Sequence, residues 1–176
     1  MTAVACLLLA APLTNAEAAS LRIELAPTTS EVAIRAYGLG LLPLDGRFAR
    51  FHGWFTYDPS DPASCQVNLT VEVASLVMSD ASTRDTVIGP DFMDAAQFPS
   101  LAYTGTCQVP GIHGMLGLHG VTRPFALSLS WSPARVIAEG ELHRADWGMT
   151  AMPILAGQTV RIVVSAPLTG NQASRD

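Results

Sequence analysis

The segment CQVNLTVEVASL, residues 65–76, alternates apolar and polar side chains with a period of two. Its apolar positions are Cys65, Val67, Leu69, Val71 and Val73. Because successive side chains of a strand point to opposite faces, the pattern predicts a strand with one dry and one wet face. LAYTGTCQV (101–109) and FALSLSW (125–131) repeat it. Strands of this kind must cover their apolar faces, either by stacking two sheets or by closing one sheet into a barrel.

Weaker alternation extends through six more segments, and turn-forming residues such as DG at 45–46 and DPSDP at 58–62 separate many of them. The six segments are SLRIEL (20–25), EVAIRAY (31–37), RFARFHGWFTY (47–57), GMLGLHG (114–120), VIAEGELH (136–143) and QTVRIVVSAPL (158–168). Parallel pairing would need helical crossovers between strands. Only residues 79–98 are long enough, and irregular enough, to hold helical turns. The sequence therefore predicts an all-β antiparallel fold.

The N-terminal 18 residues, MTAVACLLLAAPLTNAEA, are expected to be a signal peptide. They contain an apolar run at 3–13, followed by the small-x-small triplet at 16–18 that signal peptidase reads. The run is shorter than the ~20 residues of a membrane-spanning helix, so we expect no transmembrane span. The pattern predicts a periplasmic or secreted protein, with one domain at 19–170 and a C-terminal tail at 171–176.

Charge and motif content narrow the classes of function. The chain carries a net charge of -5 and no cluster of Lys or Arg, which argues against a nucleic-acid partner. Its histidines, His52, His113, His119 and His143, lack the spacing that would place two imidazoles on one metal ion. Nucleophile elbows, P-loops and dinucleotide fingerprints do not occur in the sequence. We therefore expect neither a metal, a cofactor nor an enzyme, and a hydrolase assembled from distant residues stays a minor alternative.

The two cysteines after the leader are predicted to form a disulfide. If the strand at 65–76 pairs antiparallel with the strand at 101–109 so that Cys65 faces Cys107, every apolar residue stays on one face. Such a bond would form in an oxidising compartment and would add about 2–4 kcal/mol to stability. A pair of buried free thiols is the alternative.

Aromatic residues concentrate on the apolar faces of these strands. Phe51, Phe55, Tyr57, Tyr103, Phe125 and Trp131 all fall in registers that point inward. An ordinary aromatic core explains them, and so does a cavity, because an eight-stranded barrel can hold either side chains alone or one slender ligand. Both interpretations stay open at this point.

Five segments in order resemble the YceI-like family, the lipocalin-like polyisoprenoid-binding proteins of the bacterial periplasm. They are GRFARFHGWFTYDP (46–59), SCQVNLTVEVASL (64–76), TRDTVIGPDFMDAAQFPSLAYTG (83–105), GMLGLHGVTRPFALSL (114–129) and ELHRADWGM (141–149). The resemblance implies an extended eight-stranded antiparallel barrel with a short helical connector around residues 79–98. It also implies an apolar tunnel for a long isoprenoid tail, and often a homodimer.

On this basis the inward faces become candidate cavity walls. The candidates are Phe51, Phe55, Tyr57, Val67, Leu69, Val71, Val73, Leu101, Tyr103, Phe125, Leu127, Leu129 and Trp131. In the connector, Phe92 and Phe98 are expected to pack against the barrel or its entrance. Arg84, beside Asp85, either anchors the connector through its planar fork or meets the head group of a ligand.

The sequence thus predicts a periplasmic carrier that holds a long-chain polyisoprenoid, a quinone-type lipid or a similar amphiphile in its barrel. The alternative is a structural or stress-response interaction module whose core is packed and holds no ligand.

Overall fold

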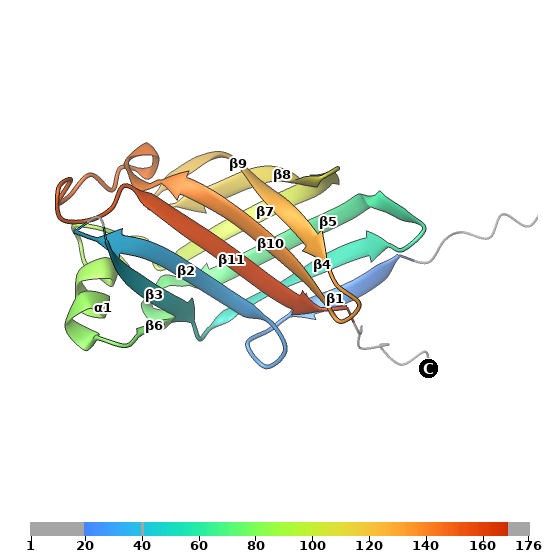
Figure 1. Cartoon of the computed structure of the whole chain (residues 1–176), viewed down its shortest axis with the longest axis horizontal. Helices are drawn as coiled ribbons and strands as arrows, with labels where there is room; N and C mark the ends of the chain where they lie inside the picture. The colour runs from blue at the N-terminus through green and yellow to red at the C-terminus, as the bar shows by residue number, and fades with distance from the viewer. Residues whose placement is uncertain (1–19, 40, 169–176) are drawn as a thin grey trace, which may run out of the picture.

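The computed structural model describes residues 20–39 and 41–168, so the expected signal peptide and C-terminal tail lie outside the described residues. Within these ranges, eleven strands form one antiparallel sheet, and the predicted all-β class is confirmed (Figure 1). The strands are β1 (Leu21–Leu25), β2 (Glu31–Gly38), β3 (Leu42–Phe48), β4 (Phe51–Asp58), β5 (Asp61–Glu72), β6 (Leu76–Met78), β7 (Ser100–Gln108), β8 (Gly111–Leu118), β9 (Val121–Trp131), β10 (Arg135–His143) and β11 (Thr159–Pro167). The helices are α1 (Ala81–Ile88) and the short 3₁₀ turns η1 (Val73–Ser75) and η2 (Arg144–Trp147).

The predicted number of eight strands is wrong, because three long strands are each interrupted. β1 and β2 both run antiparallel to the continuous path of β3 and β4, and they are separated by a turn at 26–30. β3 and β4 are separated by two residues, while β5 and β6 are separated by η1. β4 pairs with β5 and β3 pairs with β6, so the breaks in these two neighbouring strands lie side by side. The segment RFARFHGWFTY, expected to be one strand, spans such a break.

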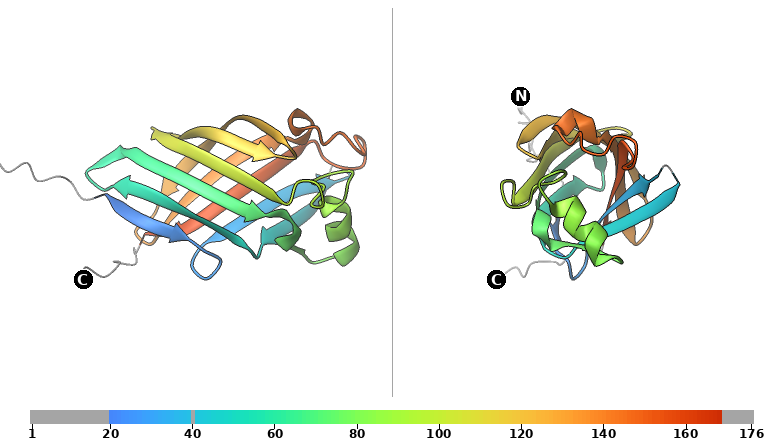
Figure 2. Two further views of the ribbon diagram at one scale, coloured as in Figure 1. Left: turned by 180° about the vertical axis from the view of Figure 1, so that it is seen from behind. Right: turned by 90° about the vertical axis from the view of Figure 1, so that its left-hand side faces the viewer.

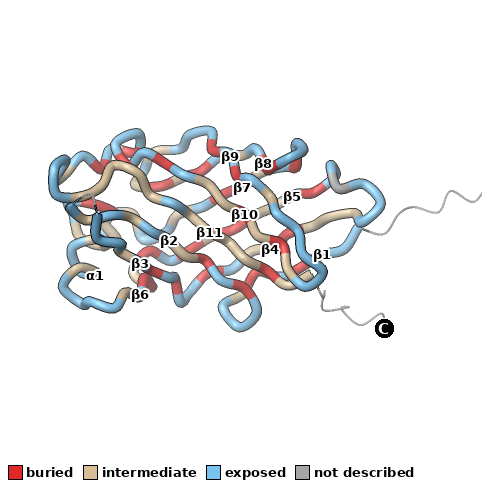
Figure 3. The backbone as a smooth tube through the Cα atoms, in the orientation of Figure 1, coloured by how far each residue is buried: buried red, intermediate tan, exposed pale blue. Residues whose placement is uncertain are grey.

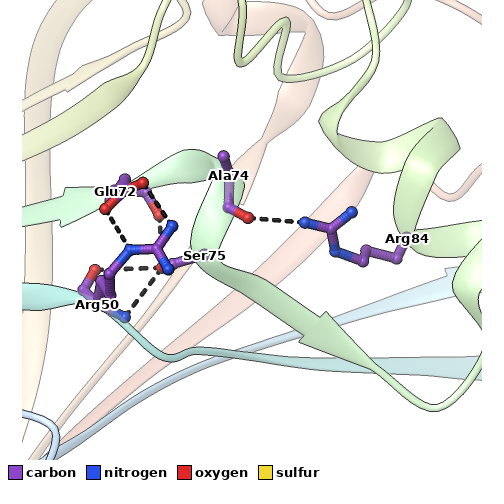
Figure 4. A network of polar contacts seen from close by, with 5 residues as sticks. All are labelled: Arg50, Glu72, Ala74, Ser75 and Arg84. Atoms are coloured by element: carbon purple, nitrogen blue, oxygen red, sulfur yellow. Dashed lines mark hydrogen bonds and ion pairs between the residues drawn. The ribbon is translucent and has the colours of Figure 1, made fainter.

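Arg50 and Ser75 hold this double break together (Figure 4). The hydroxyl of Ser75 accepts a hydrogen bond from the backbone N–H of Arg50 at 3.0 Å and donates to the carbonyl of Glu72 at 2.6 Å. The guanidinium of Arg50 also donates from Nη2 to the Glu72 carboxylate at 2.6 Å. The backbone groups that leave the sheet ladder therefore find new partners, which makes the bend stable.

The sheet closes on itself. β11 pairs with β2, and the bent path of β3 and β4 joins β2 on one side to β5 on the other. Seen end-on in Figure 2, the strands form a ring with α1 lying across one end. Figure 3 shows buried stretches along the strands and mainly exposed residues at the turns. We call the two ends of the barrel the α1 end and the disulfide end.

Cys65 and Cys107 form the predicted disulfide, with their Cα atoms 4.9 Å apart. The predicted strand register is also confirmed, since Leu69 pairs with Tyr103 and Val71 with Leu101. The bond lies at the end of the barrel farthest from α1, because β5 begins and β7 ends there.

Candidate functional site

The barrel interior contains a cavity of about 260 Å³ at the α1 end. Its walls come from β2, β3, β10 and β11, from α1 and the connector behind it, and from the loop that follows η2. Ile34 on β2, Leu142 on β10 and Val160 on β11 are typical of the lining, which is almost entirely apolar. Such a surface can bind hydrocarbon but offers few groups for chemistry.

This cavity, the larger of two in the barrel, reaches the molecular surface. Tyr37, Met152 and Leu155 line it, and each of them also has 44% or more of its area exposed. Thr86 of α1 is a further lining residue that is exposed. The mouth therefore lies between α1, the turn that joins β2 to β3, and the loop after η2.

A second, smaller cavity of about 60 Å³ lies deeper in the barrel. Its polar lining side chain is Tyr103, whose hydroxyl donates to the carbonyl of Phe125 at 3.1 Å. Burial raises the pKa of Tyr103 to about 12, because the anion would lose its hydration. The hydroxyl therefore stays neutral and hydrogen-bonded, and the compartment stays apolar.

Leu101 and Ile162 line both cavities. The two compartments therefore meet at these side chains, inside a single barrel. A slender apolar molecule that enters from the α1 end would reach the second compartment by displacing these two side chains.

Eight of the thirteen predicted lining residues lie on the smaller cavity, and Leu101 among them also lines the larger one. The eight are Phe55, Val67, Leu69, Leu101, Tyr103, Phe125, Leu127 and Leu129. The other five, which line neither cavity, are Phe51, Tyr57, Val71, Val73 and Trp131. Phe51, Val71 and Val73 are buried in the surrounding core. Trp131 is 43% exposed and packs against Tyr57, with ring centroids 5.5 Å apart.

The connector residues divide between wall and anchor. Phe92 is buried and lines the larger cavity, whereas Phe98 packs on His119 with ring centroids 4.7 Å apart. Arg84 donates to the carbonyl of Ala74 at 2.7 Å (Figure 4). It also donates to the carbonyl of Leu76 and to the carboxylate of Asp85, each at 2.8 Å. Arg84 lines neither cavity, and its partners are those of a structural anchor rather than of a head-group site.

Arg144 lines the larger cavity, whereas the sequence had suggested a cation at the barrel rim or at a strand end. It is 3% exposed, and its guanidinium lies over the ring of Phe92 at 5.2 Å. It donates to four backbone carbonyls of the loop after η2, those of Met149, Met152, Ala156 and Gly157, at 2.6–3.4 Å. Burial lowers the pKa of this guanidinium, yet an arginine stays protonated. Arg144 thus fixes one side of the mouth.

The walls from β2 and β11 were also missed as site residues. Their signal was present, because Ile34 and Ala36 share a parity in EVAIRAY, as do Val160 and Ile162 in QTVRIVVSAPL. These strands have less contrast between their faces than β5, so the alternation did not identify them as walls.

Within residues 20–39 and 41–168, no three His, Cys, Asp or Glu side chains come together in a way that could hold a metal ion. In the same part of the chain, no helix is long and apolar enough to cross a membrane.

Comparison with known proteins identifies the family. Residues 24–168 match the model of the YceI-like domain. The protein YceI of Salmonella arizonae is 29% identical over 166 residues, covering 86% of this chain and 87% of the relative. Among solved structures, BcnA of Burkholderia cenocepacia superimposes with a TM-score of 0.68 at 20% identity, covering 80% of this chain and 96% of BcnA. A polyisoprenoid-binding domain from Saccharophagus degradans, implicated in plant cell wall breakdown, gives 0.57 at 13% identity, covering 84% and 98%. The chain belongs to the YceI-like domain family.

Proposed function

We propose that this protein is a periplasmic carrier that holds a polyisoprenoid, or an amphiphile with a similar tail, inside its barrel without transforming it. The observation that carries the proposal is the pair of adjoining apolar cavities, the larger of which reaches the surface at the α1 end. A related structure is described as a polyisoprenoid-binding domain, which supports the same class of ligand. The expected leader supports the periplasmic location.

Burial of hydrocarbon would supply the affinity. Each buried methylene contributes about 0.8 kcal/mol, so a few isoprene units suffice without any specific hydrogen bond. The larger cavity, about 260 Å³, is near the lower end of ordinary ligand pockets, ~300 Å³. It suits the first units of an isoprenoid tail. A longer tail would continue past Leu101 and Ile162 into the smaller cavity.

Lipid extraction followed by mass spectrometry tests the carrier function directly. We expect the purified protein to release an isoprenoid or a similar lipid, and lipid-free protein with a tightly packed core would instead favour the interaction module. Leu101→Trp sharpens the test because it narrows the junction between the cavities. Thr104→Trp, an exposed position on the same strand, is the matched control.

We expect Leu101→Trp to retain short-chain lipids and to lose long-chain ones, while Thr104→Trp binds both as the wild type does. If the barrel instead had no room for a ligand, Leu101→Trp would overpack it and lower the free energy of unfolding by about 1–3 kcal/mol. Chain-length profiles and denaturant curves of the two variants distinguish these results.

A further inference from the structure

Seven large apolar side chains project around the mouth of the larger cavity, and we call them the apolar rim. They are Tyr37, Leu39, Leu41, Leu42, Met152, Ile154 and Leu155, with between 44% and 89% of their area exposed. They belong to two segments: the end of β2, the turn and the start of β3 at 37–42, and the loop after η2 at 152–155. Figure 1 places both at the α1 end. Single exposed apolar residues are common, but a contiguous group of this size marks an interaction site.

The two segments are fixed to each other. The N–H of Leu39 donates to the carbonyl of Leu155 at 2.8 Å, and the N–H of Gly157 donates to the carbonyl of Tyr37 at 2.7 Å. Arg144 braces the second segment from inside through its four carbonyl partners. The rim is therefore a built surface with its side chains held outward.

Both segments are uncharged. AYGLGLLPL (36–44) and WGMTAMPILAGQTV (147–160) contain no Asp, Glu, Lys, Arg or His, although the chain has 25 charged residues. Charge resumes immediately below the rim, where the side chains of Arg35 and Asp45 form an exposed ion pair on β2 and β3. Apolar tips beyond a charged pair match the profile of a bilayer interface, with hydrocarbon inside and water outside.

The rim is continuous with the cavity, since Tyr37, Met152 and Leu155 belong to both. A lipid that moved from a bilayer into the barrel across this rim would remain in apolar contact throughout. Tyr37 adds a side chain with an apolar body and a polar tip, a type that is enriched at membrane interfaces.

We propose that the apolar rim docks on the surface of a lipid bilayer, inserting its aliphatic tips among the head groups with the mouth of the cavity facing the membrane. This inference rests on the proposed carrier function and names where the lipid enters. A bilayer fits better than a second copy of the chain, because the rim consists of two narrow loop tips. Stable protein interfaces bury ~800 Å² per partner and surround an apolar centre with a polar border.

Sedimentation with phosphatidylcholine vesicles tests the docking. The test variant is Leu41→Ser combined with Ile154→Ser, since both residues are exposed and neither lines a cavity. The matched control is Leu21→Ser combined with Val109→Ser, which removes two exposed apolar side chains at the disulfide end. We expect the rim variant to bind roughly 10- to 100-fold more weakly, and the control to bind within about two-fold of the wild type.

The salt dependence and the lipid content complete the test. Docking through an uncharged rim should persist from low to high salt, whereas electrostatic binding would fade. Vesicle binding that is missing in the wild type, unchanged in the rim variant or lost at high salt would overturn the proposal. The proposal would also be overturned if the wild-type protein did not bind vesicles and instead formed a dimer that the rim substitutions dissociate. Mass spectrometry of the same preparations tests the carrier function separately. A protein that contains lipid but does not bind vesicles would refute the docking proposal and leave the carrier function standing.

Discussion

The two ends of the barrel are built from the same antiparallel sheet but differ in their cross-linking and in the size of their cavities. At the disulfide end, Cys65 and Cys107 are covalently joined and the rings of Tyr57 and Trp131 pack together. The cavity on that side is about 60 Å³. At the α1 end a cavity of about 260 Å³ is bounded by a helix and two loops rather than by strands alone. The disulfide end resembles an ordinary protein core, whereas the α1 end surrounds a cavity that is open at the apolar rim.

The difference shows how a barrel can be stable and yet contain a cavity. Leaving space next to apolar walls forfeits packing contacts, so it costs stability. In this protein most of the space lies at the α1 end, where the hydrogen bonds of the buried Arg144 hold one wall. The other end has the smaller cavity and is cross-linked. Four experiments can break or sharpen this division, in order of expected effect.

The disulfide should make the largest contribution. Replacing Cys65 and Cys107 together by serine is expected to lower the free energy of unfolding by about 2–4 kcal/mol, because the unfolded chain gains freedom when the loop is opened. Urea unfolding of the two forms measures this. Hydrogen exchange should accelerate first in β5 and β7 near the bond. Equal acceleration in α1 would contradict the independence of the two ends.

Arg144 should matter nearly as much, but at the opposite end. Arg144→Met keeps much of the apolar volume and removes the donors of four loop carbonyls, so we expect a loss of about 3 kcal/mol. Arg144→Lys is the comparison, since an ammonium cannot reproduce the planar fork and should restore only part of the loss. Exchange rates of residues 149–157 should rise in both variants. Intact protection of that loop in Arg144→Met would show that the rim is held by other contacts.

Much of the disulfide end could be predicted from sequence, for a physical reason. Sharp alternation in β5 and β7 fixed which residues face inward, and a single register then placed Cys65 against Cys107 and Leu69 against Tyr103. A slip of one residue would have turned every apolar side chain to water. Register and bond therefore followed from one constraint.

The α1 end resisted prediction because its walls depend on tertiary contacts. The interruption at Ser75 divides a strand that alternation predicts as continuous, and it is one of the three interruptions that separate the eleven observed strands from the eight implied by the resemblance. Arg144 was interpreted from the sequence as a rim or strand-end cation, and only the folded loop surrounds its guanidinium with carbonyls. From the sequence, Arg84 could either anchor the connector or meet the head group of a ligand. Its hydrogen bonds to backbone carbonyls favour the anchor.

Alkaline pH should weaken the packed end. The pKa of Tyr103 rises from 10.0 to about 12 in the folded protein. The neutral Tyr103 side chain makes its full contribution to the free energy of unfolding below pH 10. That contribution is lost as the pH rises toward 12, because Tyr103 ionises first in the unfolded chain. We expect a loss of roughly 2–3 kcal/mol over that interval. Tyr103→Phe cannot ionise, so its unfolding free energy should fall less over the same range, and identical slopes for the two proteins would place the pH dependence elsewhere.

Acid should act on the α1 end, with the smallest effect. Asp80 caps α1 by accepting a hydrogen bond from the N–H of Thr83 at 2.6 Å. The side chain of Thr83, and then its backbone N–H, hold the pKa of Asp80 below its ordinary value of 3.8. The cap is therefore complete above that pH and is lost as the pH falls through the folded value, which should fray the first turn of α1 while the barrel stays folded. Backbone NMR shifts of residues 81–88 follow this change. Asp80→Asn caps without titrating, so its helix shifts should stay constant in acid, and a parallel drift in both proteins would show that α1 is held by Arg84 rather than by its cap.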